Sequence, residues 1–205
     1  LPTTSAGHMA QLDRYAKIYV KFTTPGDHPR LALFLRRLEA IDTTTVYPFL
    51  LFAYGELMPD RQTEFDALLG VIESFLVRRM ICGLTPKNYN RLFIDLIKAV
   101  DKAHEVSAAF VSSWLAKGTG ESVRFPDNEE LLTAIWGMPF YKRLSQSKVR
   151  LVLEALEFAA QHNKSEVLAL PDGPTIEHVL PQKWREHWPL SAEILADPVK
   201  AQQAA

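Results

Sequence analysis

Apolar residues recur every three or four positions along most of this chain, from about residue 12 to residue 161. That spacing places them on one face of an α-helix, whereas a half-buried strand alternates at every second residue. We therefore expect a mainly α fold, a multi-helix domain. The pattern predicts helices over 12–22, 28–41, 46–58, 60–80, 85–100, 106–115, 131–136 and 147–161.

The segment 46–58 differs from the other predicted helices because it is apolar nearly all round. Phe49, Leu50, Phe52 and Leu57 lie on different sides of a helix drawn through it. A helix with this pattern is usually covered on every side. We expect it to lie near the centre of the domain.

The pattern changes near residue 163. Two short apolar runs, at 166–170 and 175–179, flank a Pro-Asp-Gly-Pro turn, which is typical of two strands. The sequence thus predicts a helical domain over 1–163 and a short β-containing segment within 164–205.

Composition and charge exclude several classes of protein. The 47% hydrophobic and 23% charged residues are those of a globular domain. Charges interrupt every apolar run well short of the roughly 20 residues of a membrane span, so we expect no membrane partner. The single cysteine suits a reducing compartment, and we expect a cytoplasmic protein. With a net charge of -1, any DNA contact has to be local.

The pair Glu177-His178, with Pro181 downstream, is the sharpest candidate for chemistry. A carboxylate is a ligand that Mg²⁺ prefers, and an imidazole titrates near neutrality and can deprotonate a water. Neighbouring residues on a strand face opposite ways, so both serve one site only where the strand ends or bends. By itself, such a pair is more often a solvated surface pair.

The run TIEHVLPQ at 175–182, followed by Trp184 and Trp188, resembles the opening of the HNH domain in the GmrSD-type restriction endonucleases. These include phosphorothioate-sensing effectors of the Ssp type. Looser similarities to the helical middle of that family lie at 73–93, 125–130 and 138–141. The resemblance extends over about residues 10–190.

The resemblance implies a protein of three parts: a ParB-like nucleotide-hydrolysing domain, a helical region, and an HNH nuclease of the ββα-metal type that cuts DNA. His178 would be the general base, and Glu177 a ligand of a divalent metal, Mg²⁺ or Mn²⁺. The implied partners are DNA and the linked nucleotide-hydrolysing domain. The family's later Gly-Asn-Leu segment has no counterpart, since the last asparagine is Asn163. We therefore expect residues 164–205 to be the N-terminal part of an HNH module, inactive alone.

Arg78, Arg79, Lys183 and Arg185 are the candidates for contacts with DNA. For the two adjacent arginines the alternative, which we favour, is pairing with acidic residues of neighbouring helices that fixes packing.

Two further interpretations stay open. We interpret the basic residues Lys142, Arg143, Lys148 and Arg150 as a solvated face rather than a track for DNA. For the whole chain, the alternative to a nuclease is a non-catalytic helical scaffold that regulates a linked nucleotide-hydrolysing domain.

Overall fold

The computed structural model describes residues 4–26 and 28–161, together with the single residues Lys183, Glu186, Ser191 and Ala196. The chain divides into two units, Leu1–Glu157 and Phe158–Ala205. The strands predicted at 166–170 and 175–179 lie outside the described residues, so the assignment of 164–205 to an HNH module stays a prediction.

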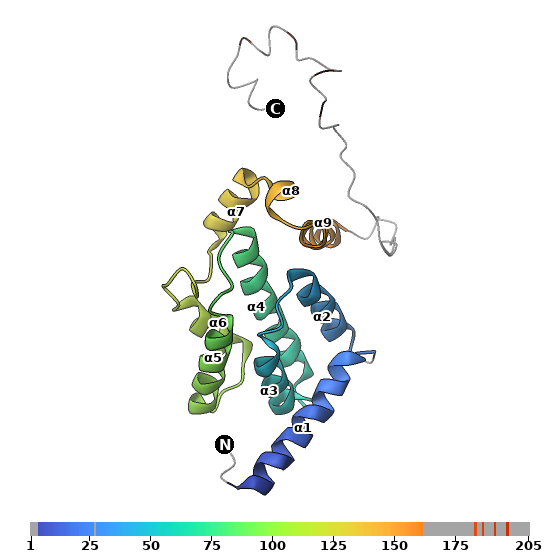
Figure 1. Cartoon of the computed structure of the whole chain (residues 1–205), viewed down its shortest axis with the longest axis vertical. Coiled ribbons are helices and arrows are strands. Elements are labelled where there is room, and N and C mark those ends of the chain that lie inside the picture. Colours follow the sequence, from blue (N-terminus) through green and yellow to red (C-terminus); the bar gives the residue numbers. More distant parts are fainter. Residues whose placement is uncertain are drawn as a thin grey trace. The chain divides into compact units, whose positions relative to one another are not determined.

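The described residues form helices and contain no strand, which confirms the mainly α prediction. None of these helices combines the length and the apolarity of a membrane span. In chain order (Figure 1) they are α1 Ser5–Thr23, α2 Pro29–Ile41, α3 Tyr47–Leu57, α4 Gln62–Ile81, α5 Tyr89–Ala103, α6 Ala108–Ala116, α7 Asn128–Gly137, α8 Phe140–Arg143 and α9 Gln146–Ala160.

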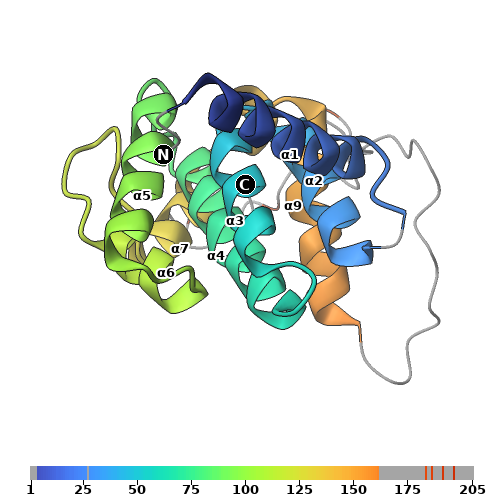
Figure 2. The same ribbon diagram turned by 90° about the horizontal axis from the view of Figure 1, so that it is seen from below.

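Helices α3 and α4 lie between two groups of neighbours. Helix α3 packs against α1, α4 and α5, and α4 packs against α2, α3, α6 and α7. Figures 1 and 2 both show this pair with α1 and α2 on one side and α5 and α6 on the other. The central position predicted for the segment 46–58 is therefore correct, and α4 shares it.

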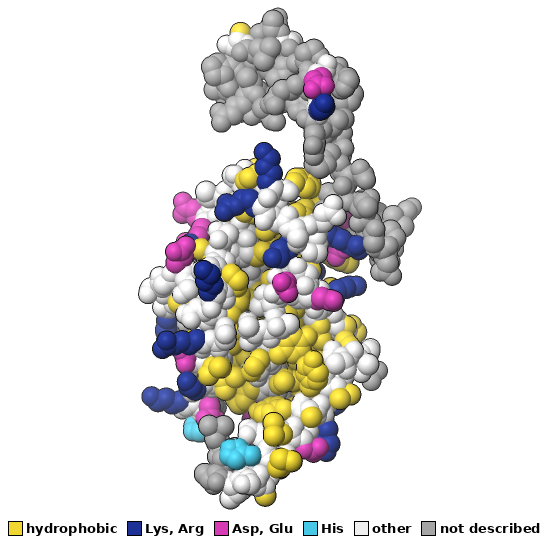
Figure 3. All heavy atoms as spheres, viewed as in Figure 1, with side chains coloured by type: hydrophobic (Ala, Val, Ile, Leu, Met, Phe, Trp, Pro, Cys, Tyr) yellow, Lys and Arg dark blue, Asp and Glu magenta, His cyan; other side chains and the backbone are white. Residues whose placement is uncertain are grey.

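The apolar surface of α3 is covered less completely than its composition predicts. Phe49 and Leu50 have no exposed surface, but Leu51 and Phe52 are only partly buried. Figure 3 shows hydrophobic side chains gathered where α3 lies in Figure 1. An apolar pattern on all sides thus reflects one fully buried face and one partly exposed face.

Aromatic side chains join the helices in the core. Phe93 of α5 stacks on Phe49 of α3, with ring centroids 6.4 Å apart, and Tyr54 meets Phe65 of α4 edge to face at 5.3 Å. Phe49, Phe65 and Phe93 have no exposed surface. Burying a side chain of this size stabilises the fold by roughly 1.5–3 kcal/mol.

The starts of α1 and α5 differ most from the predictions. Helix α1 begins at Ser5 instead of residue 12, because the Thr4 hydroxyl accepts a hydrogen bond from the Gly7 amide at 3.1 Å and caps the first turn. Helix α5 begins at Tyr89 rather than at Thr85. The Thr85 carbonyl accepts from Arg79, and the Tyr89 amide donates to the Pro86 carbonyl at 3.1 Å in a tighter turn.

Helix α4 ends at Ile81, one residue past its predicted end, and a left-handed glycine follows two residues later. Gly83 has a φ of 69°, a backbone conformation that is strained for a residue with a side chain. The Leu84 amide donates to the Arg79 carbonyl at 2.9 Å, and the Gly83 amide donates to the Met80 carbonyl at 3.2 Å. These bonds satisfy carbonyls of the last turn and reverse the chain direction. The reversal brings Arg78 and Arg79 to the segments that follow.

Candidate functional site

The predicted catalytic pair, Glu177 and His178, lies outside the described residues, and so does Arg185. Lys183 is described and exposed, and its ammonium lies 3.9 Å from the Glu186 carboxylate. The roles given to these residues stay predictions. Of the predicted site residues, Arg78 and Arg79 are the ones whose surroundings the structure describes in full.

Arg79 lies inside the helical unit with no exposed surface. Its N–H groups reach three separate parts of the chain. They donate to the Tyr89 hydroxyl at 3.0 Å and to the carbonyls of Thr85, Glu121 and Arg124 at 2.8, 3.2 and 2.6 Å. A buried charge is costly unless its donors are satisfied, and here each guanidinium nitrogen has an acceptor.

Two aromatic rings enclose the Arg79 guanidinium. Its central carbon lies 5.3 Å from the ring centroids of both Phe75 and Tyr89. Attraction between the cation and the ring faces adds to the hydrogen bonds at this desolvated position. Burial raises the pKa of the Tyr89 hydroxyl, and the adjacent guanidinium opposes that rise in part. Tyr89 is therefore a neutral phenol at physiological pH and accepts from Arg79 as such.

Arg78 points to the same part of the chain from the partly exposed side of α4. Its guanidinium donates to the Ser74 hydroxyl at 3.1 Å, the Pro126 carbonyl at 3.2 Å and the Asn128 side-chain oxygen at 2.6 Å. Both arginines thus hold residues 121–128 against the end of α4. Their contacts support the packing interpretation, although the partners are carbonyl, hydroxyl and amide groups instead of the acidic side chains that we expected.

A salt bridge holds the start of α7, next to the residues that Arg78 and Arg79 contact. The Arg124 guanidinium donates to both oxygens of Glu130, at 2.6 Å for one of them. The hydrogen bond lowers the pKa of the Glu130 carboxyl and raises that of Arg124. Asp127 caps α7 by accepting from the Glu130 amide at 2.8 Å. The Glu130 side chain bonds to Arg124.

The hydrogen-bond partners of Arg79 could not be predicted from the sequence. Main-chain carbonyls are present at every residue, so no residue type marks Glu121 or Arg124 as acceptors. The role of Tyr89 could have been anticipated. The apolar spacing of its helix puts Tyr89 on the buried face, and a buried tyrosine hydroxyl usually has a hydrogen-bond partner.

The described residues do not fit a divalent metal. Within 4–26 and 28–161, no three His, Cys, Asp or Glu side chains converge as ligands. Magnesium keeps its water shell unless several oxygen ligands meet around it. The metal prediction therefore rests on Glu177 and His178 alone.

Comparison with known proteins identifies the C-terminal part of the chain. Residues 125–204 match the family of the C-terminal domain of GmrSD restriction endonucleases. No curated protein and no solved structure matches the chain. The matched region starts at Phe125, within the segment that Arg78 and Arg79 hold, and contains Glu177 and His178. Over these residues, which make up less than half of the chain, the sequence is similar to the GmrSD-type restriction endonucleases.

Proposed function

We propose that the chain is the C-terminal region of an HNH-type endonuclease that nicks or cleaves DNA in a bacterial restriction or anti-phage system. The observation that carries this proposal is the family match over 125–204, which includes the Glu177-His178 pair. A family of restriction endonucleases implies DNA as the substrate. A linked nucleotide-hydrolysing domain and a cytoplasmic location belong to the same proposal.

In this proposal, His178 and Glu177 divide the chemistry. The His178 imidazole takes the proton from the attacking water, for which a group titrating near neutral pH is well suited. Glu177 supplies a carboxylate ligand for Mg²⁺ or Mn²⁺. A bound divalent ion offsets the negative charge that develops on phosphate oxygens. Lys183, Arg185 and the partly exposed Arg78 are the candidates for contacts with DNA phosphates.

The helical unit holds the first residues of the matched region in place. Arg79, Arg78 and the Arg124–Glu130 salt bridge join the first residues of the matched region to α4. A nuclease module needs its reacting groups held within a fraction of an ångström, and a rigid supporting element favours that. These contacts support a mechanical role for the helical unit in either interpretation of the chain.

The test is a His178→Ala variant of the complete natural protein. We expect it to lose DNA cleavage while folding and nucleotide hydrolysis remain, because the base acts only on the water of the nuclease reaction. His8→Ala is the matched control, since His8 is exposed on α1 and belongs to no predicted site. Cleavage at the wild-type rate by His178→Ala removes this residue from the mechanism. A complete protein that never cleaves DNA, but whose nucleotide hydrolysis depends on the helical unit, is the scaffold of the alternative interpretation.

A further inference from the structure

The corner between α7 and α8 carries an aromatic side chain that the helical unit leaves uncovered. Trp136, next to the last residue of α7, is 87% exposed, and Leu132, one turn earlier on the same face, is 56% exposed. None of the described residues of α7 is buried, and α4 is the one described helix against which α7 packs. Figure 1 shows α7 and α8 at one end of the helical unit. Exposed apolar surface beside polar residues is typical of a binding site.

The residues around this corner carry positive charge and no negative charge. Residues 131–153 include four cations, Lys142, Arg143, Lys148 and Arg150, and no aspartate or glutamate. Lys142 and Arg143, at the end of α8, are exposed, as expected of a solvated face. Neither side chain has an ion pair or hydrogen bond within the described part of the chain. A chain with a net charge of -1 needs such a local concentration of cations for any contact with DNA.

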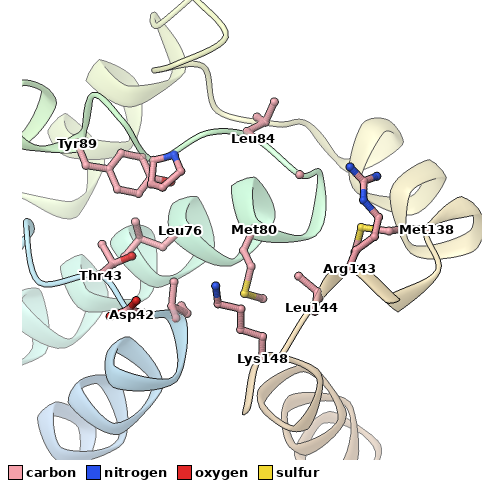
Figure 4. A pocket seen from close by; sticks show the side chains of 13 residues that line it. Asp42, Thr43, Leu76, Met80, Leu84, Tyr89, Met138, Arg143, Leu144 and Lys148 are labelled. Carbon is pink, nitrogen blue, oxygen red and sulfur yellow. The ribbon is translucent and has the colours of Figure 1, made fainter. Parts of the chain in front are cut away.

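The four cations differ in what surrounds them. Arg150 forms an ion pair within its own helix, α9. Figure 4 shows the Lys148 ammonium on the side of Asp42, whereas the Arg143 guanidinium lies beside Met138 of the corner. The acidic residues of α7 lie in its first turn, about two turns from the corner. The two cations of α8 are thus the ones that a ligand at the corner meets.

An exposed indole next to exposed cations fits single-stranded DNA better than other partners. Every base presents a flat face that stacks on an aromatic ring, and the adjoining phosphates attract cations. In a duplex the neighbouring bases cover these faces, so the ring gains little from contact with it. A protein partner would cover Trp136 but would leave the charges of Lys142 and Arg143 without a role.

We propose that the α7–α8 corner binds single-stranded DNA, with a base stacked on Trp136 and with Lys142 and Arg143 on separate phosphates of the same strand. The choice of DNA rests on the proposed function, because the corner lies within residues 125–204, which resemble a restriction-endonuclease domain. The inference adds the element that holds the DNA and the form of DNA that it holds. It does not depend on catalysis by Glu177 and His178, and its test needs no cleavage.

The experiment measures binding of the 205-residue chain to a fluorescein-labelled strand of about 12 nucleotides, and to the duplex of the same sequence. Fluorescence polarisation in EDTA follows binding without cleavage. We expect Trp136→Ala to weaken binding of the single strand by about tenfold and binding of the duplex by less than about twofold. Trp136→Phe keeps an aromatic face and is expected to retain most of the binding. Because Trp136 is exposed, the urea midpoint of both variants should stay at the wild-type value.

Variants of the cations test their contacts with phosphates. Lys142→Met and Arg143→Met each remove one charge, so each is expected to reduce the slope of log Kd against log salt for the single strand by about 0.7. Lys102→Met is the matched control, since Lys102 is an exposed cation in the last turn of α5 and lies outside the corner. We expect its salt slope to equal that of the wild-type chain.

Several outcomes would overturn the inference. It fails if Trp136→Ala binds the single strand as tightly as the wild type, if it weakens both probes equally, or if Lys102→Met changes the salt slope as much as Lys142→Met. It also fails if the chain is an oligomer in sedimentation that Trp136→Ala dissociates, because the corner is then a contact between proteins. If the chain binds neither probe, the inference fails by itself, and the cleavage assay of His178→Ala in the complete protein decides the proposed function separately.

Discussion

Arg79 is a full charge held inside the helical unit by uncharged acceptors. Replacing it with methionine keeps the stem but leaves the carbonyls of Thr85, Glu121 and Arg124 without their donor. Buried groups left unsatisfied are costly, and we expect Arg79→Met to lower the free energy of unfolding by about 3–5 kcal/mol. Urea denaturation followed by circular dichroism measures this change.

The adjacent arginine is the matched control for that prediction. Arg78 is partly exposed, so water replaces its contacts with Pro126 and Asn128 when it is removed. We expect Arg78→Met to cost only about 1 kcal/mol. Equal losses for the two variants would mean that the burial of Arg79 contributes nothing to the stability of the fold.

Phe93 offers a second pair of neighbouring positions with opposite exposure. Phe93 has no exposed surface and contacts Phe49 and Tyr89, whereas Ile94 is 47% exposed. We expect Phe93→Ala to destabilise the protein by roughly 3–5 kcal/mol through lost burial and a residual cavity. Ile94→Ala is expected to change stability by less than about 0.5 kcal/mol. If the denaturation midpoint of Phe93→Ala is unchanged, the face of α5 that carries Phe93 is not the buried one.

Among the elements, α7 depends on a salt bridge that titrates. Hydrogen bonding to Arg124 lowers the pKa of Glu130, so the folded protein holds this carboxylate ionised more strongly than the unfolded chain does. The stabilisation is complete above the unfolded value, near 4.3, and is lost as the pH falls through the lower folded value. We expect Glu130→Gln to destabilise the protein at pH 7 and to differ less from wild type at pH 3 than at pH 7. Urea midpoints of both proteins at the two pH values measure this, and a difference that grows in acid contradicts the assignment.

The helices show how far sequence patterns extend and where tertiary contacts override them. Apolar spacing predicted α2, α4 and α9 closely, because one face of each packs on the core. It misplaced the start of α5, since the Thr85 carbonyl accepts a hydrogen bond from the side chain of Arg79 in α4 and the helix begins only at Tyr89. A Thr-Pro start is a local signal, and it does not show that the side chain of a preceding helix will bond to the same residue. The short α8 has no apolar period at all, and the pattern missed it.

At the scale of the whole molecule, the sequence indicated the resemblance to a family, and the structure added the arrangement of the helices around the end of α4. The motif around Glu177-His178 pointed to GmrSD-type endonucleases, and the match over 125–204 bears this out. A hollow of about 360 Å³ at the end of α4 is lined by Arg143 and Lys148 among other residues (Figure 4), and it was not predictable, because its walls come from α2, α4, α8 and α9. Such a hollow forms only once the helices pack. The sequence showed a group of basic residues, but it could not show which of them line the same cavity.

The last prediction concerns catalysis by a polypeptide of these 205 residues. Phosphodiester hydrolysis at a metal needs a base, ligands that hold the ion, and charge stabilisation at the leaving oxygen. After His178 the sequence holds His187 but no asparagine, and residues 4–26 and 28–161 provide no converging group of ligands. One carboxylate, Glu177, holds Mg²⁺ too weakly against water. We therefore expect this polypeptide to nick supercoiled plasmid poorly or not at all with Mg²⁺ or Mn²⁺. Robust nicking that disappears in His178→Ala would contradict this and would give His187 or another residue the missing ligand role.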